Sequence, residues 1–182
     1  MKTNKILICG SGELGSRYLQ GLKSCILPLE VNVFDINKRA LSLAKRRWEE
    51  KEFQGFNHTV SYLSSLNSLK DDMDICIVTT TANNRLDAIK NICASTNVRN
   101  WILEKVLVQN SEELKSLYTH FGEKNKVWVN IPRREMVWHQ EIKQYFQSQS
   151  EKISEINVYG GNWGLACNSI HFLDLFLSFW DY

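Results

Sequence analysis

The stretch KILICGSGELGSRYLQGL, residues 5–22, decides how the chain folds. It opens with an apolar run of the kind found in buried strands, and then passes through glycines at positions 10, 12 and 15. After the last glycine, apolar residues recur at the spacing of one helix face. This order predicts a strand, a tight glycine turn and a helix, which together begin a βαβ unit.

The three glycines have separate expected tasks in this turn. Gly10 allows the tight turn itself, Gly12 lets a pyrophosphate approach the backbone, and Gly15 lets the helix pack closely on the strand. Asp35 ends the second predicted strand about 20 residues later, where a carboxylate accepts hydrogen bonds from ribose hydroxyls. The residues predicted to bind a dinucleotide at this turn are Gly10, Ser11, Gly12, Glu13, Leu14, Gly15 and Asp35.

Asp35 also bears on which dinucleotide is bound. Its charge repels the additional phosphate of NADP and its oxygens bond the free hydroxyl of NAD, so NAD is the predicted cofactor. Lys38 and Arg39 follow closely and keep NADP open as the second choice, although solvated helix residues are the plainer interpretation. A methyltransferase that binds S-adenosylmethionine is a competing interpretation, and the third glycine argues against it.

The alternation of strands and helices continues along the chain, which predicts an α/β fold with a doubly wound parallel Rossmann sheet of about six strands. The expected strands span residues 5–10, 31–35, 58–62, 74–79, 101–105 and 126–130, and the expected helices between them span 13–24, 37–50, 83–95 and 111–123. A connecting helix at 136–148, a strand at 152–161 and an apolar helix at 165–180 follow. We expect a dinucleotide-binding domain over 1–132, and the beginning of a truncated α+β domain over 133–182.

Composition narrows the classes of function. The chain of 182 residues has a net charge of only +2, and its basic residues form no stripe for nucleic acid. No apolar run reaches the roughly 18 residues of a membrane helix. Five cysteines without paired spacing fit reduced thiols in a cytoplasmic protein, and four scattered histidines suggest no metal site.

Several motifs together resemble the Gfo/Idh/MocA oxidoreductases, the family of glucose-fructose oxidoreductase and inositol dehydrogenase. They are ICGSGELG, VFDINKRA, VTTTANNR, LEKV, NIPRRE and GGNWGLACNSIHFLDLF, and they extend over essentially the whole chain. The resemblance implies hydride transfer between a nicotinamide and a hydroxyl carbon of a sugar, polyol or nucleotide-sugar derivative. The alternative is a dinucleotide-binding protein or remnant without turnover.

The resemblance also implies roles for residues at the ends of the fourth and fifth strands. Relatives carry Glu-Lys-Pro after the fifth strand, and this chain has Glu104-Lys105-Val106. The resemblance implies that Glu104 and Lys105 bind the cofactor. Lys105 is also the implied catalytic residue that holds or polarises the substrate oxygen, because an ammonium stabilises negative charge that develops there. Thr80 and Thr81 replace the usual Thr-Pro-Asn, so hydroxyl groups are expected to line that edge of the cofactor.

In the second domain, relatives carry an aspartate, a histidine four residues later and then an Asp-Leu pair. His171, Asp174 and Leu175 match, whereas Cys167 stands where the first aspartate is expected, so one acid/base carboxylate is missing. The resemblance makes His171 the second catalytic residue. The weaker substrate candidates are Arg133, Arg134, Trp163 and Asp174. Relatives continue through a broad sheet that covers the last helix, so this chain resembles a truncated form with an exposed apolar patch and is expected to form homo-oligomers through its C-terminal region.

Overall fold

The computed structural model describes residues 3–50, 58–121, 125–149, 153–162 and 164–180. The chain divides into two compact units, Met1–Val129 and Asn130–Tyr182. The predicted cofactor-binding residues all belong to the first unit, while His171, Cys167 and the two candidate arginines belong to the second.

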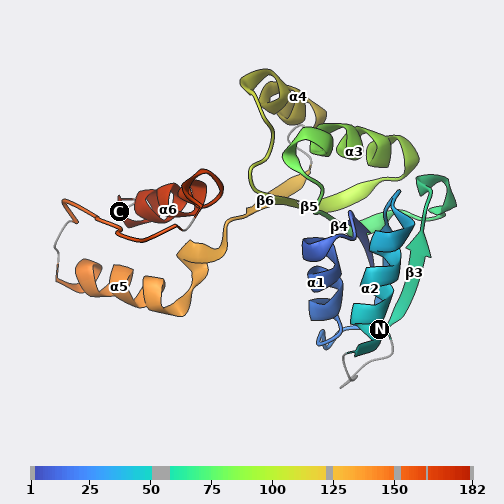
Figure 1. Ribbon diagram of the computed structural model, residues 1–182, viewed down its shortest axis with the longest axis horizontal. Helices are drawn as coiled ribbons and strands as arrows, with labels where there is room; N and C mark the ends of the chain where they lie inside the picture. Colours follow the sequence, from blue (N-terminus) through green and yellow to red (C-terminus); the bar gives the residue numbers. More distant parts are fainter. Residues whose placement is uncertain (1–2, 51–57, 122–124, 150–152, 163, 181–182) are drawn as a thin grey trace. The chain divides into compact units, whose positions relative to one another are not determined.

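The first unit is built on a six-stranded sheet with the order β3-β2-β1-β4-β5-β6 (Figure 1). Every pair whose register is defined is parallel, from β3 across to β5. The order reverses between β1 and β4, which makes that boundary the switch point where open α/β sheets bind ligands. The strands are β1 (Asn4–Cys9), β2 (Leu29–Phe34), β3 (Thr59–Leu63), β4 (Met73–Val78), β5 (Val98–Glu104) and β6 (Lys126–Asn130).

Helices cover both faces of this sheet because successive residues of β1 point to opposite sides. Ile6 and Ile8 pack in a core cluster with Leu19 of α1, whereas Leu7 and Cys9 pack in a second cluster with Ile89 of α3. The helices of the first unit are α1 (Glu13–Leu22), α2 (Lys38–Glu50), α3 (Ala82–Ser95) and α4 (Ser111–Phe121), with a short 3-10 turn η1 (Leu66–Ser68). The predicted doubly wound Rossmann sheet is confirmed.

The second unit contains the 3-10 turn η2 (Pro132–Glu135) and the helices α5 (Val137–Ser148) and α6 (Leu165–Trp180). Both helices fall where the sequence predicts them. Leu175 and Phe179 of α6 are buried within the unit, and the Lys143 ammonium of α5 donates to the backbone oxygen of Ser178 at 2.6 Å. No helix among the described residues is long and apolar enough to cross a membrane.

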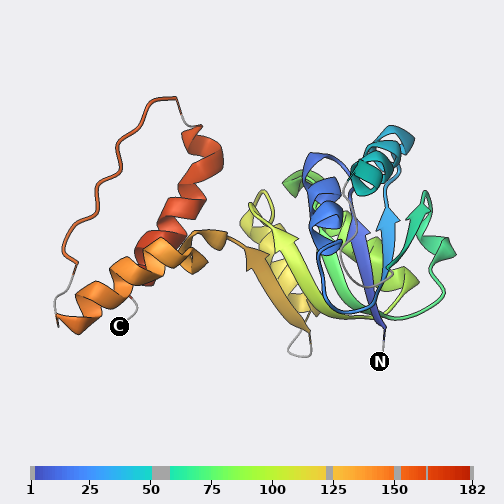
Figure 2. The same cartoon turned by 90° about the horizontal axis from the view of Figure 1, so that it is seen from below.

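The predicted strand at 152–161 is wrong over the residues that the structure describes. Residues 153–160 form no strand, and Figure 2 shows this stretch as a long loop between α5 and α6. A strand needs a neighbour that satisfies its backbone N–H and C=O groups. Residues 153–162 and 164–180 contain no strand that could pair with it, so the sequence pattern alone does not produce one.

Candidate functional site

Four neighbouring strands deliver the predicted cofactor-binding residues to one edge of the sheet. The glycine turn follows β1, Asp35 follows β2, Thr79–Thr81 follow β4, and Lys105 follows β5. Because these strands are parallel, their carboxyl ends meet at the same edge, on both sides of the switch point. The fold therefore brings together predicted residues that are up to 95 positions apart in the chain.

Gly10 and Gly15 are required by the packing of the turn. Gly10 has φ of +92°, a backbone conformation that side chains disfavour, and a Cβ there would lie 3.1 Å from the Thr80 nitrogen. A Cβ at Gly15 would lie 1.9 Å from the Gly10 carbonyl oxygen, a separation that no atom pair tolerates. Both positions allow α1 to begin directly against the end of β1, as predicted.

Gly12 serves a different purpose, because the space around it is open. A Cβ at Gly12 would meet nothing within 4 Å, and the residue stands immediately before the first turn of α1. Unpaired backbone N–H groups at a helix N-terminus attract anions. The geometry fits a dinucleotide pyrophosphate at this position, where a side chain would otherwise intrude.

The Asp35 carboxylate holds the glycine turn in place. One of its oxygens accepts hydrogen bonds from the Ser11 backbone N–H at 2.7 Å and from the Ser11 hydroxyl at 3.1 Å. The other oxygen accepts from the Asn37 backbone N–H at 2.8 Å. A carboxylate oxygen has two acceptor positions, so the oxygen facing Asn37 retains room for a ribose hydroxyl.

Thr79 contributes to the turn, although the sequence prediction omitted it. Its hydroxyl donates to the Gly10 carbonyl oxygen at 2.6 Å and so links the end of β4 to the glycine turn. The neighbouring Thr80 hydroxyl is buried without a hydrogen-bond partner among the described residues. Buried hydroxyls are normally paired, so this oxygen fits a site completed by a bound polar group. Thr81 is exposed and donates to the Asn83 side-chain oxygen at 2.6 Å.

Glu104 ends β5 at the carboxyl edge of the sheet, where the sequence predicts it, and it is buried there. The residue is 6% exposed, and its carboxylate accepts a hydrogen bond of 2.6 Å from the Tyr18 hydroxyl of α1. Sequence reasoning placed Tyr18 on the first helix but gave it no part in the site, and the pair is 86 positions apart. Lys105 follows as a half-buried residue, and its peptide bond to Val106 is cis.

Glu13 and Leu14 lie on the first turn of α1, and both are exposed. The Arg47 guanidinium of α2 contacts the Glu13 carboxylate at 2.5 Å and also donates to the Ser16 hydroxyl at 2.5 Å. The hydrogen bond from Arg47 to the Glu13 carboxylate holds the pKa of Glu13 below its usual range. Arg47 thereby ties α2 to the beginning of α1, a contact that the sequence pattern did not indicate.

The second unit accounts for most of the remaining predicted residues. Arg134 forms a bidentate ion pair with Asp174, with 2.8 Å between the Arg134 Nε and one carboxylate oxygen. Arg133 lies instead over the Phe172 ring, with 4.3 Å between its guanidinium carbon and the ring centroid. His171 is half-buried on α6, and the Cys167 side chain is exposed. Trp163 lies outside the described residues.

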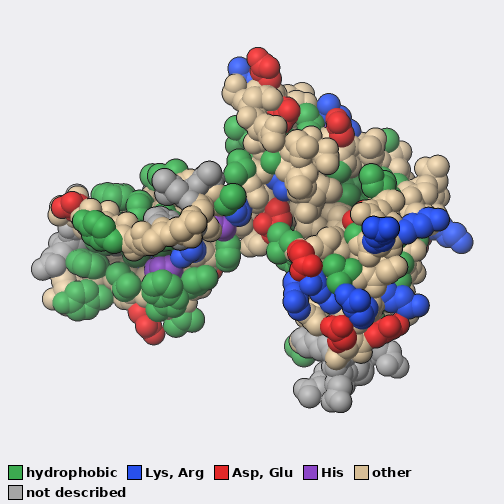
Figure 3. Space-filling model, in the orientation of Figure 1, with side chains coloured by type: hydrophobic (Ala, Val, Ile, Leu, Met, Phe, Trp, Pro, Cys, Tyr) green, Lys and Arg blue, Asp and Glu red, His purple; other side chains and the backbone are tan. Residues whose placement is uncertain are grey.

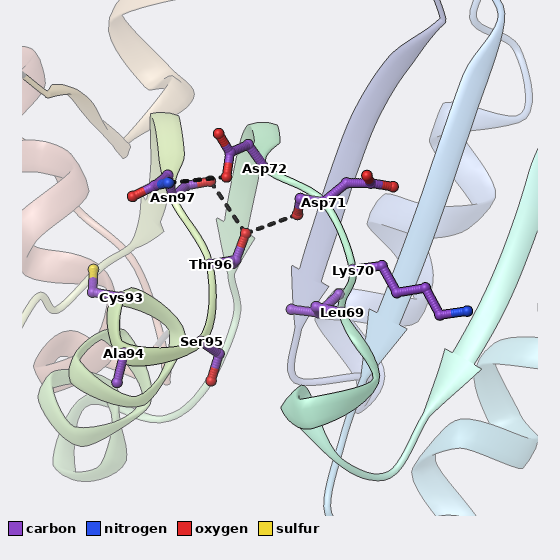
Figure 4. A pocket seen from close by; sticks show the side chains of 9 residues that line it. All are labelled: Leu69, Lys70, Asp71, Asp72, Cys93, Ala94, Ser95, Thr96 and Asn97. Atoms are coloured by element: carbon purple, nitrogen blue, oxygen red, sulfur yellow. Dashed lines mark hydrogen bonds between the residues drawn. The ribbon is translucent and has the colours of Figure 1, made fainter.

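A cavity of about 280 Å³ lies away from this edge of the sheet (Figure 4). The two segments that line it precede β4 and β5, so the cavity is at the opposite, amino end of those strands. Polar side chains of its lining contact one another, for example through a 3.0 Å hydrogen bond from the Asn97 side chain to Asp72. The described residues contain no cluster of three metal-ligating side chains there or elsewhere. The lining residues are Leu69, Lys70, Asp71, Asp72, Cys93, Ala94, Ser95, Thr96 and Asn97.

Comparison with known proteins gives matches through structure. No family model matches the chain, and no curated protein matches its sequence. A myo-inositol dehydrogenase from Lactobacillus casei, solved in complex with NAD(H) and myo-inositol, superposes with a TM-score of 0.75 over 99% of this chain at 16% identity. The chain has the fold of the matching half of this inositol dehydrogenase. A scyllo-inositol dehydrogenase from the same organism, with bound NAD(H) and scyllo-inositol, matches 98% of the chain at 17% identity and a TM-score of 0.68.

The same dehydrogenase fold also occurs in a protein described as a regulator. The transcriptional regulator Gal80p from Kluyveromyces lactis covers 96% of this chain at 16% identity, with a TM-score of 0.67. The chain spans about half the length of the solved structures it matches, 55% of the myo-inositol dehydrogenase and 50% of the regulator. The likeness thus establishes the fold and leaves both catalysis and binding without turnover as functions to be tested.

Proposed function

We propose that the chain is an NAD-dependent oxidoreductase of the Gfo/Idh/MocA type, which acts on a CH–OH group of a sugar, polyol or nucleotide-sugar derivative. The observation that carries the proposal is the glycine turn: open space at Gly12, closed packing at Gly15 and a carboxylate from Asp35 against Ser11. These features fit NAD and disfavour the additional phosphate of NADP. Neighbours of the same fold that were solved with NAD(H) support this assignment.

Lys105 is the proposed catalytic residue of the first unit. A bound NAD, held by the glycine turn and Asp35, would supply the hydride acceptor for the carbinol carbon. The hydroxyl proton must leave as the C–H bond breaks, so that the carbinol becomes a carbonyl. An ammonium beside the oxygen stabilises the negative charge that develops during this step. Lys105 lies directly after β5, at the edge where the cofactor-binding residues meet.

His171 is the proposed acid/base residue of the second unit. An imidazole accepts a proton near neutral pH, which suits removal of the hydroxyl proton. Cys167 precedes it by one helical turn on α6 and stands where relatives supply a carboxylate. This departure favours the second candidate function, a protein that binds NAD without turnover, and the fold shared with a transcriptional regulator supports the same alternative.

The first prediction concerns the choice of cofactor. Asp35→Ala should weaken NAD binding by on the order of 1–3 kcal/mol, since it leaves a ribose hydroxyl unpaired and releases Ser11 from the glycine turn. The preference for NAD over NADP should narrow, because the repulsive charge is lost. Calorimetric titration of the folded protein with both cofactors measures this, and Asp87→Ala, an exposed carboxylate of α3, is the control. Absence of binding of either cofactor to the unaltered chain contradicts the proposal.

The second prediction concerns self-association through the second unit, which we propose as its route to homo-oligomers. Leu173, Leu177 and Trp180 are exposed on one face of α6, and Figure 3 shows hydrophobic side chains gathered over this unit. At about 25 cal/mol per Å², covering a few hundred Å² of this face contributes several kcal/mol before the cost of association.

Leu177→Glu should therefore shift the protein toward a monomer. Light scattering after size exclusion measures the change. Ile26→Glu is the control, because it introduces the same charge at an apolar residue of the first unit that is 78% exposed. It should leave the molar mass of the particle in solution unaltered. A monomeric unaltered chain at high concentration counts against self-association.

A further inference from the structure

Arg85 is a buried cation that has no role in the proposed mechanism. It lies in the first turn of α3, and the residue is only 2% exposed, although arginine is almost never buried without partners. Its guanidinium donates to the backbone oxygens of Thr80 and Val106, and to that of Leu107 at 3.0 Å. These three acceptors belong to two different loops, one after β4 and one after β5.

Arg85 joins the two loops beyond the last hydrogen-bonded pair of β4 and β5. The parallel register between β4 and β5 ends at the pair Val78 and Leu103. Thr80 and Val106 lie beyond that pair, so their backbone oxygens have no place in the ladder of the two strands. The planar guanidinium spans the gap with several donors in fixed directions, which an ammonium cannot do.

Charge around Arg85 favours the same arrangement. Burial lowers the pKa of Arg85, whereas the buried Glu104 carboxylate opposes that shift. Glu104 is in turn held by the Tyr18 hydroxyl at 2.6 Å. The residues on either side of Lys105 are thus fixed by groups from α1 and α3, namely Tyr18 at Glu104 and Arg85 at Val106.

We propose that Arg85 is a positioning residue that fixes the loop of Lys105 relative to the cofactor edge at Thr80. The inference rests on the proposed function for the identity of the cofactor, but the coupling of the two loops stands on the contacts of Arg85 alone. Arg85 touches neither the cofactor nor the reacting atoms in this role. It acts by holding the two backbone segments from which Thr80 and Lys105 project.

The test is Arg85→Lys, which keeps the charge but cannot reach three carbonyl oxygens from one nitrogen. We expect the dissociation constant for NAD to rise about tenfold, the scale for loss of a charge-assisted hydrogen bond. Hydrogen exchange of the protein without cofactor should quicken at residues 79–81 and 105–108 and stay unaltered in β1 and β2. Arg99→Lys is the matched control, because Arg99 is an exposed arginine of β5 whose guanidinium pairs with Asp74 at 3.2 Å.

The outcomes separate this inference from the proposed function. If the unaltered chain binds no NAD, the proposed function fails, and the exchange measurement still tests the coupling of the two loops. Unaltered NAD binding together with unaltered loop exchange in Arg85→Lys overturns the inference. Exchange that quickens across the whole first unit, or a variant that does not fold, also overturns it, because Arg85 would then support the core rather than the two loops.

Discussion

Gly15→Ala is expected to lower the stability of the first unit by about 3 kcal/mol or more and to abolish NAD binding with it. The alanine Cβ would lie 1.9 Å from the Gly10 carbonyl oxygen and 2.6 Å from the Thr79 hydroxyl. Neither the backbone oxygen nor the start of α1 can move without breaking the turn. Thermal unfolding should show a midpoint lowered by roughly 6–12 °C.

Two other glycines of the same region provide the controls. Gly21 lies in α1 with nothing within 4 Å of its Cβ position, so Gly21→Ala should stabilise the helix by about 0.5–1 kcal/mol and leave NAD binding unaltered. Gly12→Ala should leave stability nearly unaltered, because its Cβ also meets nothing. It should nevertheless weaken NAD binding at least about tenfold, or 1.4 kcal/mol, since the methyl group occupies the proposed pyrophosphate space.

The contrast between Gly12 and Gly15 is what decides the cofactor assignment. If the glycine turn served only packing, the folded fractions of Gly12→Ala and Gly15→Ala would bind NAD with equal affinity. Gly12→Ala with full affinity for NAD would place the pyrophosphate elsewhere. Gly15→Ala with normal stability would contradict the close packing of α1 on β1.

The sheet could be predicted from the sequence because its signals are local. Apolar runs of strand length, helical spacing between them and the glycine turn are each read within a short window, and parallel connection then follows from their alternation. The predicted strand at 152–161 did not form over residues 153–160, because the described residues of the second unit hold no strand that could pair with it. Pairing partners are a property of the fold and not of the segment.

The candidate site could be predicted only in part for the same reason. Asp35 and the glycines carry a recognisable spacing, so their place at the sheet edge was foreseen. Sequence reasoning assigned no role to Tyr18 and Arg85, although Arg85 ends the VTTTANNR motif, and their partners lie in other segments of the chain, 86 positions away for Glu104 and 21 for Val106. An arginine in the first turn of a helix has the pattern of a solvated residue, and only the fold shows that it is buried.

Lys105→Met is expected to reduce turnover by about 10²–10⁴-fold while NAD binding changes little, because the ammonium acts on the substrate oxygen in the transition state. Activity is measured as NADH formed with a panel of inositols, sugars and nucleotide sugars. Lys115→Met, on the exposed side of α4, removes the same charge away from the site and should leave turnover unaltered. Full activity of Lys105→Met would exclude the proposed role.

Cys167→Asp completes this prediction, because it introduces the carboxylate that the resemblance to the Gfo/Idh/MocA oxidoreductases predicts at that position. If the chain follows their chemistry, the substitution should raise turnover, since a second acid/base group then joins His171 on the same helix. The exposed position of Cys167 accommodates a carboxylate without burying its charge. NAD binding without turnover in both the unaltered chain and Cys167→Asp would instead favour the non-catalytic function, because the missing carboxylate would not be what prevents the reaction.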